Sequence, residues 1–528
     1  MTWDYIIIGA GSSGCALAYE LVRAGRSVLI IEAGGSDRSP FIKFPAGTRR
    51  AGAKFDWGYR SQPDPSRNGV TENWTRGRVL GGSSSINGMM YVRGTKEDYD
   101  RWDLPGWSAK AVMPIFREME CSDQLGPVRG QGGPLHVRTI RHPHGIVQAF
   151  AAAAHGAGFP YNPDYNGESQ EGVAFAQLSQ RRGFRCSAAD AFLRPLLGRK
   201  NLKLLLDTLV EKINFENGRA TSVTLMQQGR RRQELARDIV LCAGAINSPK
   251  LLMLSGIGDE EELSRLKIGV VRNLPAVGRH LKEHPLVTLG FRTKVPTNNL
   301  TEGLFQKLGF AAKFLWHGDG PIADLFECAV FARSTPAQAN PDLQIVFMSK
   351  GFVKKPDGRF KLAPYPSVSV HIIESYPKSN GRIRLSSNDP NDPPLIESNL
   401  LENRADVDTL VNGIETLRKI MATEPMNGLI EEEITPGADI RSASELEDFV
   451  RARASISFHP IGTCRMGVGE GYVVDPEMRV YGTENLWIAD ASIVPQPLSA
   501  NMNAPCIMIG LKLGKQLVRR DNATVGTE

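Results

Sequence analysis

The chain has 528 residues, of which 41% are hydrophobic and 23% charged, and its formal net charge is +6 at pH 7. These proportions are typical of soluble globular proteins, and they exclude disordered, collagen-like and coiled-coil chains. The small basic excess contains no dense cationic block, so the sequence does not predict nucleic-acid binding.

The cysteines indicate a reducing compartment. The chain has 7 of them, an odd number, and none belongs to a C-x-x-C pair of the kind that binds zinc. No stretch approaches the roughly 18 apolar residues of a membrane-spanning helix, and no basic residue precedes Arg23 as in a secretory signal. We expect a cytoplasmic protein with no metal site and no integral membrane segment, which is compatible with a membrane-associated electron acceptor.

The N-terminal residues predict a strand, a tight turn, a helix and a second strand. Residues 4–8 are a short apolar run, and the sequence GAGSSG follows directly at 9–14. The next apolar residues have helical spacing as far as Gly25, and residues 27–34 are typical of a buried strand. These elements, within about 30 residues, are the opening of a doubly wound sheet.

Later segments predict further parts of this sheet and a second domain. Residues 238–258 predict a strand, a turn of small residues and a helix that begins near Ser248. Residues 486–495 predict a strand that ends at a carboxylate, and residues 503–517 predict a helix capped by Asn503. Between about 290 and 450, alternating strand-like runs indicate an inserted, more antiparallel domain.

A glycine motif between the first strand and its helix predicts a nucleotide site. Gly9, Gly11 and Gly14 form G-x-G-x-x-G, where the backbone and the free N–H groups of a helix can approach a pyrophosphate. Glu32 ends the second strand, where its carboxylate can bind an adenosine ribose. This motif suits NAD and FAD alike. The glycine- and serine-rich loop that begins at 77 favours FAD, because it can fold over a large flat cofactor and its phosphates.

With these motifs the chain resembles the glucose-methanol-choline (GMC) family of FAD-dependent oxidoreductases, in its choline dehydrogenase-like and aryl-alcohol-oxidising branch. Both family signatures are present, at 77–100 and 244–258. The segments VGRHLKEHP (277–285), HPIGTCRMG (459–467) and NAPCIMIG (503–510) also match in order. The resemblance covers nearly the whole chain and is least specific in the middle region.

The resemblance implies FAD as the cofactor and assigns its contacts residue by residue. They are Gly9, Gly11, Gly14 and Glu32 for the ADP half, Arg78, Gly82, Ser83 and Asn87 for the pyrophosphate and flavin, Val210 for adenine, and Asp490 and Ala491 for the ribityl and pyrophosphate region. Some relatives attach FAD covalently through a histidine where this chain has Ile86. Because isoleucine has no nucleophilic nitrogen, we expect non-covalent FAD.

Two residues are predicted to carry the chemistry. Oxidation of an alcohol needs a base beside the hydroxyl group, and His459 is the predicted base because an imidazole accepts a proton near neutral pH. The resemblance makes Asn503 the second residue, whose amide would donate to the alcohol oxygen, with a plain helix cap as the alternative. Glu327 and Phe458 are the predicted pocket residues, with a salt bridge and core packing as their respective alternatives.

The expected fold is α/β, with a Rossmann-like FAD-binding domain and an inserted α+β substrate domain built on an antiparallel sheet. The FAD-binding domain would take residues 1–155, 190–290 and 452–528, of which the last part carries the catalytic residues. The substrate domain would take an excursion at 156–189 and its main part at 291–451.

We predict an FAD-dependent alcohol oxidase or dehydrogenase. It would oxidise a primary alcohol, with aromatic and furanic alcohols as candidates, by hydride transfer to flavin N5, and O2 or another acceptor would reoxidise it. The first alternative is an FAD-containing lyase of the same fold that cleaves cyanohydrins without net redox. An NAD enzyme is disfavoured by the two FAD signatures, and a non-catalytic flavin protein by the presence of His459 and Asn503. The individual alcohol, the acceptor and the oligomeric state stay open.

Overall fold

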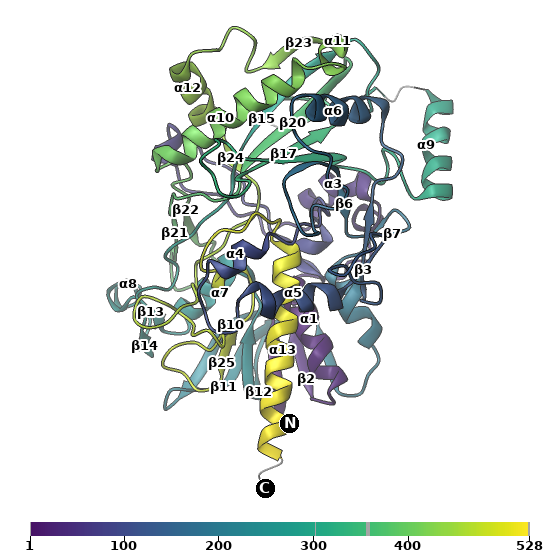
Figure 1. The fold of residues 1–528 in the computed structure, drawn as a ribbon. Helices are drawn as coiled ribbons and strands as arrows, with labels where there is room; N and C mark the ends of the chain where they lie inside the picture. The colour runs from purple at the N-terminus through teal and green to yellow at the C-terminus, as the bar shows by residue number, and fades with distance from the viewer. Residues whose placement is uncertain (1, 301–302, 355–359, 526–528) are drawn as a thin grey trace.

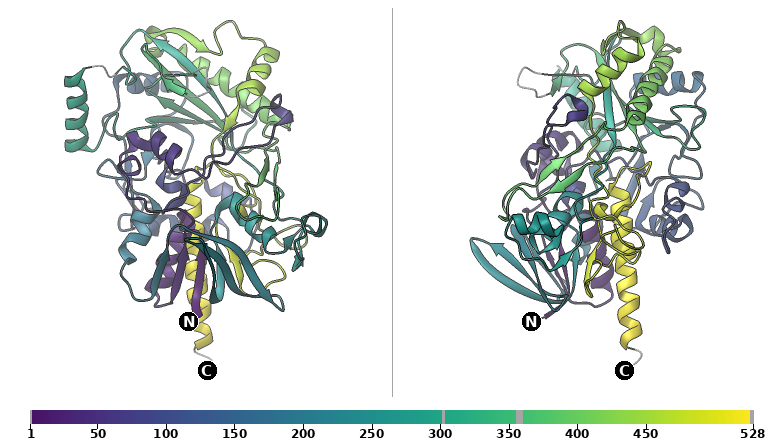
Figure 2. Two further views of the ribbon diagram at one scale, coloured as in Figure 1. Left: turned by 180° about the vertical axis from the view of Figure 1, so that it is seen from behind. Right: turned by 90° about the vertical axis from the view of Figure 1, so that its left-hand side faces the viewer.

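Two β-sheets organise the molecule, one towards each end of an elongated body (Figure 1). The computed structural model describes residues 2–300, 303–354 and 360–525. Both termini lie at the end that holds the first sheet, and the C-terminal helix runs from there towards the centre of the molecule (Figures 1 and 2).

The first sheet has the strand order β10-β11-β12-β1-β2-β9, and β25 pairs with β12. Its strands are β1 Thr2–Ile8, β2 Val28–Ile31, β9 Leu202–Leu205, β10 Thr208–Glu216, β11 Arg219–Gln227, β12 Arg230–Leu241 and β25 Leu486–Ile488. β1 is parallel to both β2 and β12, and β2 is parallel to β9. The apolar runs of β1 and β2 are buried, as is usual for parallel strands covered on both faces. The predicted strand-helix-strand opening is therefore confirmed.

Helices α1 and α13 cross closely against this sheet. The helices of this part are α1 Ser12–Arg23, α2 Pro40–Lys43, α3 Thr48–Lys54, α4 Lys96–Asp100, α5 Ala109–Met119, α7 Gly244–Leu254, α8 Glu260–Arg265 and α13 Asn503–Val525. A Cβ at Gly510 would lie 2.3 Å from the carbonyl oxygen of Ser13, so only glycine permits this approach. The crossing brings the first turn of α13 to the glycine-rich turn.

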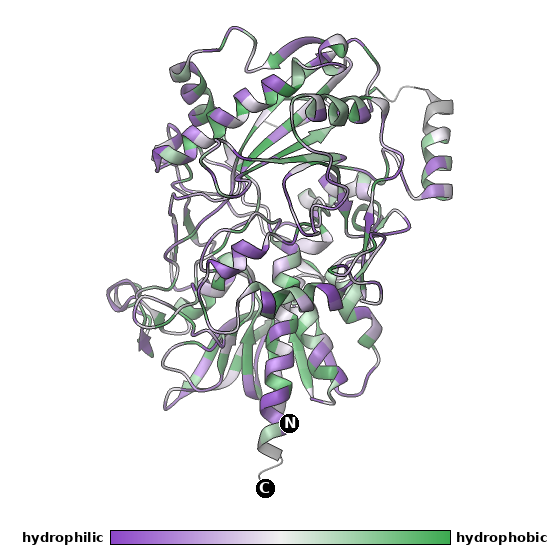
Figure 3. Ribbon diagram, viewed as in Figure 1, coloured by the Kyte–Doolittle hydropathy of each residue, from purple (hydrophilic) through white to green (hydrophobic). Residues whose placement is uncertain are grey.

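The second sheet is antiparallel, with the order β23-β15-β20-β17-β16-β5 and with β24 paired to β15. Its strands are β5 Gly172–Phe175, β15 Pro285–Thr293, β16 Cys328–Ala332, β17 Leu343–Met348, β20 Ser367–Glu374, β23 Ile430–Thr435 and β24 Ser455–Ile456. Helices α6 Gly145–Gly156, α10 Arg404–Met421, α11 Met426–Leu429 and α12 Ala443–Arg453 share one apolar core with one of its faces. Figure 3 shows these strands mostly in the hydrophobic colour. The opposite face packs on Met89 and Met90, and so looks towards the first domain.

One further helix and several short strands lie outside these two sheets. They are β3 Glu120–Ser122, β4 Leu135–Thr139, β6 Gln177–Leu178, β7 Gln180–Arg181, β8 Phe184–Arg185, β13 Ile257–Gly258, β14 Arg272–Asn273, α9 Leu304–His317, β18 Phe352–Lys354, β19 Phe360–Leu362, β21 Arg382–Arg384 and β22 Leu395–Glu397.

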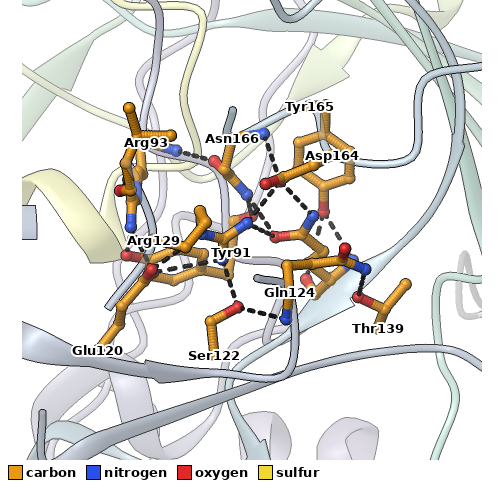
Figure 4. Close-up of polar contacts among 12 residues, drawn as sticks. Tyr91, Arg93, Glu120, Ser122, Gln124, Arg129, Thr139, Asp164, Tyr165 and Asn166 are labelled. Carbon is orange, nitrogen blue, oxygen red and sulfur yellow. Dashed lines mark hydrogen bonds and ion pairs between the residues drawn. The ribbon is translucent and has the colours of Figure 1, made fainter. Parts of the chain in front are cut away.

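A buried ionic network fixes the chain where it passes between the two parts (Figure 4). Arg129 donates to Glu120 at 2.8 Å and to Asp164 at 2.5 Å, and Arg93 forms an ion pair with the same Glu120. Loss of one partner would leave a buried charge uncompensated, so the network holds residues 164–177 firmly on the first domain. It borders a cavity of about 900 Å³, which none of the predicted site residues lines.

Helix α7 begins earlier than predicted, at Gly244 rather than near Ser248. Pro249 lies inside the helix, where it cannot donate a hydrogen bond to the carbonyl of Ala245. The hydroxyl of Thr463 donates to that carbonyl instead, at 2.6 Å. A residue more than 200 positions away therefore compensates the proline, which local sequence reasoning does not anticipate.

Two elements bear on the expected domain boundaries. Helix α6 ends at Gly156 and packs on the second sheet, although the first boundary was expected after residue 155. Strand β15 of the same sheet begins at Pro285, although the second boundary was expected after residue 290. We propose boundaries before α6 and before β15.

The described residues hold 7 free cysteines and no group of three or more histidines, cysteines or acids that would bind a metal ion. Within the same residues, none of the helices has the length and apolar composition needed to cross a membrane.

Candidate active site

The glycine-rich turn is packed so tightly that side chains are excluded from it. A Cβ at Gly9 would lie 2.4 Å from the carbonyl oxygen of Cys242, and one at Gly14 would lie 2.0 Å from that of Gly9. At Gly11, by contrast, a Cβ would meet nothing within 4 Å. Open space therefore faces the N-terminus of α1, where backbone N–H groups favour an anion such as a pyrophosphate.

The first signature loop lies directly on this turn. A Cβ at Gly82, whose φ is +54°, would lie 2.9 Å from Cα of Gly11. The amide of Gly81 donates to the carbonyl of Ala10 at 2.8 Å, and the hydroxyl of Ser83 accepts from the amide of Gly77 at 3.1 Å. The structure thus brings together two motifs that are about 70 residues apart, as cofactor binding requires.

Glu32 is buried at the end of β2, where its two carboxylate oxygens accept the N–H groups of Ala10 (3.0 Å) and Gly34 (2.8 Å). Burial raises the pKa of Glu32 to about 7, although these two hydrogen bonds act to lower it. Arg78 lies beside it, with its guanidinium 4.8 Å from the ring centroid of Trp57. Each oxygen of Glu32 keeps a lone pair for a ribose hydroxyl.

The other predicted cofactor residues surround the same region. Asn87 accepts a hydrogen bond from Arg185 at 2.7 Å, and Val210 is buried in β10. Asp490 accepts from the amide of Gly244 (2.8 Å) and from Ser248 (2.5 Å). Asp490 therefore joins α7 to the 3₁₀ turn that starts at its neighbour Ala491. The residues present fit a large dinucleotide that spans the glycine-rich turn and the signature loop.

His459 has a polar partner at each ring nitrogen. Its Nε2 lies 3.2 Å from the amide nitrogen of Asn501, and its Nδ1 lies 3.2 Å from Nδ1 of His284. The backbone N–H groups of His284 and His459 both donate to Oε1 of Glu283, at 2.9 and 2.7 Å. Burial, followed by the neighbouring His284 and the cation Arg76, holds the pKa of His459 well below its usual value. The imidazole is therefore neutral, and one of its ring nitrogens carries a lone pair.

A chain of amide contacts sets which nitrogen of His459 is the acceptor. The side-chain amide of Gln344, a buried residue of β17, donates to Oδ1 of Asn501 at 3.2 Å. This turns the N–H2 group of Asn501 towards Nε2 of His459, so Nε2 carries the lone pair and Nδ1 the proton, which points to His284. Burial lowers the pKa of His284 to about 4, so it stays a neutral acceptor for that proton.

Asn503 and Asn501 have different surroundings. Oδ1 of Asn503 accepts a hydrogen bond from the hydroxyl of Ser12 at 2.7 Å, so this side chain faces the glycine-rich turn. The contact with the predicted base is made by Asn501, two residues earlier. Sequence reasoning did not single out Asn501, although it precedes the same helix and carries the same amide group.

The two predicted pocket residues have different contacts. Phe458 is half exposed, has a φ of +63° and lies 5.9 Å from the guanidinium of Arg76. Its left-handed backbone is unusual for a bulky residue and redirects the chain just before His459. Glu327 is buried and accepts the amide N–H of Ser349 at 2.8 Å. The charged groups that act on Glu327 are Lys350 and Lys313, and its pKa is raised by burial.

Phe326, two residues before β16, packs between the signature loop and His371 of β20. The ring of Phe326 would clash with a Cβ at Gly88, at 2.2 Å, and lies 6.1 Å from the ring of His371. His371 Nδ1 is 2.7 Å from the hydroxyl of Thr288, and burial lowers the pKa of His371 to about 4. Thr288, Gln344 and His371 are polar residues within the largely apolar strands β15, β17 and β20. Polar residues in such strands are the sequence signal that would have identified them.

Comparisons with known proteins agree with this arrangement. Two family profiles, both described as GMC oxidoreductase, match residues 3–286 and 377–510. The chain is 37% identical to the mitochondrial choline dehydrogenase of Mus musculus, over 97% of this chain and 88% of that protein. It is 35% identical to an alcohol dehydrogenase [acceptor] of Pseudomonas putida, over 98% of this chain and 96% of the relative. The crystal structure of pyridoxine 4-oxidase from Mesorbium loti matches with a TM-score of 0.89 and 29% identity, over 98% and 99% of the two chains.

Proposed function

The chain belongs to the GMC oxidoreductase family, and from this we propose that it oxidises a neutral primary alcohol with an aromatic or furanic ring to the aldehyde. The expected family, its FAD cofactor and alcohol oxidation are confirmed by the relatives, which are dehydrogenases and an oxidase by name. The cyanohydrin-cleaving alternative therefore has no support.

The single observation that carries the mechanism is the contact of Nε2 of His459 with Asn501. With its proton held on Nδ1 by His284, His459 presents a lone pair at Nε2 and can take the hydroxyl proton of the alcohol. The N–H2 group of Asn501 stands beside the same nitrogen, where it can donate to the alcohol oxygen as negative charge develops. FAD, when bound, supplies the hydride acceptor.

The choice of a neutral ring-bearing alcohol rests on the side chains that face the site. Phe326 and His371 give aromatic surfaces between the signature loop and the second sheet. Burial also keeps the pKa of His371 near 4, so this ring adds no positive charge. The acid that would have suited a cationic substrate, Glu327, is turned to the amide of Ser349 instead.

The proposed attachment of FAD is non-covalent. Ile86 is buried in an apolar cluster with Ile42, Ala51 and Val79, and it offers no nucleophile. Acid precipitation should release the yellow cofactor into the supernatant, whereas flavin retained in the protein pellet would contradict this.

We place the protein in the cytoplasm, where a reducing environment suits its free cysteines. Its electron acceptor, O2 or another oxidant, is the second reactant that the cycle requires.

The substrate proposal is tested by anaerobic mixing of the yellow holoenzyme with benzyl alcohol, furfuryl alcohol and choline in separate experiments. The proposal predicts loss of the flavin absorbance with the two ring-bearing alcohols at concentrations where choline gives little change. Rapid bleaching by choline alone would contradict the substrate class while leaving alcohol oxidation in place.

A further inference from the structure

Helix α9 (Leu304–His317) stands away from the body of the molecule, at its side near the second sheet (Figures 1 and 2). Three large apolar side chains of this helix are strongly exposed: Leu308 by 56%, Leu315 by 76% and Trp316 by 80%. Residues 308 and 315 are two helical turns apart, so with Trp316 they form one outward stripe. An exposed stripe of this size and composition is uncommon on a protein surface that faces water alone.

The opposite side of α9 is fixed by an aromatic cluster. Phe314 is buried, and its ring centroid lies 5.7 Å from that of Phe44 and 5.0 Å from that of Phe184. Phe44 and Phe184 contact each other at 5.1 Å. Lys313 donates from the same helix to the carbonyl of His142 at 2.8 Å. The outward direction of Leu315 and Trp316 therefore follows from how the helix is anchored.

The segments that hold this aromatic cluster are rich in exposed cations. Arg49, Arg50 and Lys54 lie on α3, which begins four residues after Phe44, and Arg181 and Arg182 lie on the hairpin that carries Phe184. None of these five side chains forms an ion pair with an acid of the described part of the chain. The nearby acids Asp319 and Asp324 are both neutralised by Arg138.

We propose that α9 and these basic segments form a docking surface for an anionic lipid bilayer. Tryptophan and leucine side chains on a helix that protrudes can enter the headgroup region, while arginines and lysines around them attract anionic lipids. Because no helix of the described residues can cross a bilayer, the protein would lie on the membrane surface.

The surface fits a lipid better than a second copy of the chain. In a two-fold dimer through this face, the same patch would meet itself and would bring the five cations of each copy together. A protein partner would need a complementary groove for a convex ridge. A fluid anionic surface accommodates the ridge and neutralises the cations simultaneously.

Flotation of the intact holoenzyme with lipid vesicles tests this inference. We expect binding to vesicles that contain phosphatidylglycerol, little binding to vesicles of phosphatidylcholine alone, and release by high salt. Leu315→Ser with Trp316→Ser should lower the bound fraction about tenfold, and Arg181→Glu with Arg182→Glu should do so as well. Leu125→Ser is the matched control, since Leu125 is 83% exposed in a loop outside this surface. Flavin content and alcohol oxidation should be unchanged in all three.

A second readout locates the contact. Quenching of tryptophan emission by brominated lipids should be clear in the wild type and reduced in Trp316→Ser alone. Equal flotation of wild type and variants, or no flotation at all, would overturn the inference. A dimer in solution that dissociates in Leu315→Ser with Trp316→Ser would also overturn it, by assigning the surface to a second copy.

Discussion

At the scale of single residues, the two asparagines at the start of α13 make different contacts, and we propose different roles for them. Asn501 contacts the ring of His459, whereas Asn503 accepts a hydrogen bond from Ser12 of the glycine-rich turn. Asn501→Ala should slow flavin reduction by roughly 100-fold to 1,000-fold with full FAD content, the cost of losing a donor to developing charge. Asn503→Ala should instead lower FAD content or affinity. Anaerobic stopped-flow and the flavin-to-protein absorbance ratio measure both, and the reverse pattern would favour Asn503, the residue predicted from the sequence, as the second catalytic residue.

Gln344 acts on the base through Asn501. Gln344→Met keeps the volume but removes the donor that orients the Asn501 amide, so flavin reduction should slow by about tenfold. Ser369→Ala is the control, because Ser369 is buried on the neighbouring strand β20. Thermal stability and FAD content should be unchanged in both variants. A wild-type rate in Gln344→Met would show that Asn501 holds its orientation without this contact.

The depressed pKa of His284 makes stability depend on pH. Burial lowers its pKa from 6.5 to about 4 in the folded protein, so between these values only the unfolded chain binds the proton. Above pH 6.5 this group therefore does not lower the free energy of unfolding. As the pH falls from 6.5 towards 4, protonation of His284 in the unfolded chain lowers the free energy of unfolding by about 3 kcal/mol. The melting temperature of His284→Asn should fall less steeply over this range than that of the wild type. Parallel curves for the two proteins would contradict the assignment.

At the scale of elements, the contact between the signature loop and the glycine-rich turn holds the cofactor site together. A side chain at Gly82 would meet Cα of Gly11 at 2.9 Å in a backbone conformation that favours glycine. Gly82→Val should therefore yield a folded protein with little bound FAD, as absorbance at purification would report. Gly52→Ala in α3 is the control, because a Cβ there meets nothing within 4 Å and full FAD content is expected. Normal FAD content in Gly82→Val would show that the loop can move aside.

The same elements show what sequence reasoning can predict. The strand, turn and helix around Gly9 were predictable because the spacing of glycines and apolar residues is local. The start of α7 was not, since the hydroxyl of Thr463 takes the carbonyl that Pro249 leaves unbonded. The contact of His459 with Asn501 likewise depends on how the chain enters α13, which spacing in the sequence does not determine.

At the scale of the whole molecule, the two-sheet architecture followed from composition and order of strands. The sequence predicted a doubly wound first sheet and a more antiparallel second domain. The second sheet is antiparallel, whereas the first is mixed: β25, β12, β1, β2 and β9 are parallel, and β10, β11 and β12 form an antiparallel meander. It did not predict that Gln344 of the second sheet would reach Asn501, or that Phe326 and His371 would lie beside the signature loop. These contacts join segments that are far apart in the sequence, so local patterns do not reveal them. The ionic network around Arg129 is a second example of such packing.

The most direct test of this account is single-turnover reduction of bound flavin, without oxygen, in the wild type and in His459→Ala with a primary aromatic alcohol. Both proteins should bind FAD fully, and the variant should lose roughly 100-fold to 10,000-fold in rate, because no base remains for the hydroxyl proton. Equal rates of flavin reduction in the two proteins would contradict His459 as the base and, with it, the proposed mechanism.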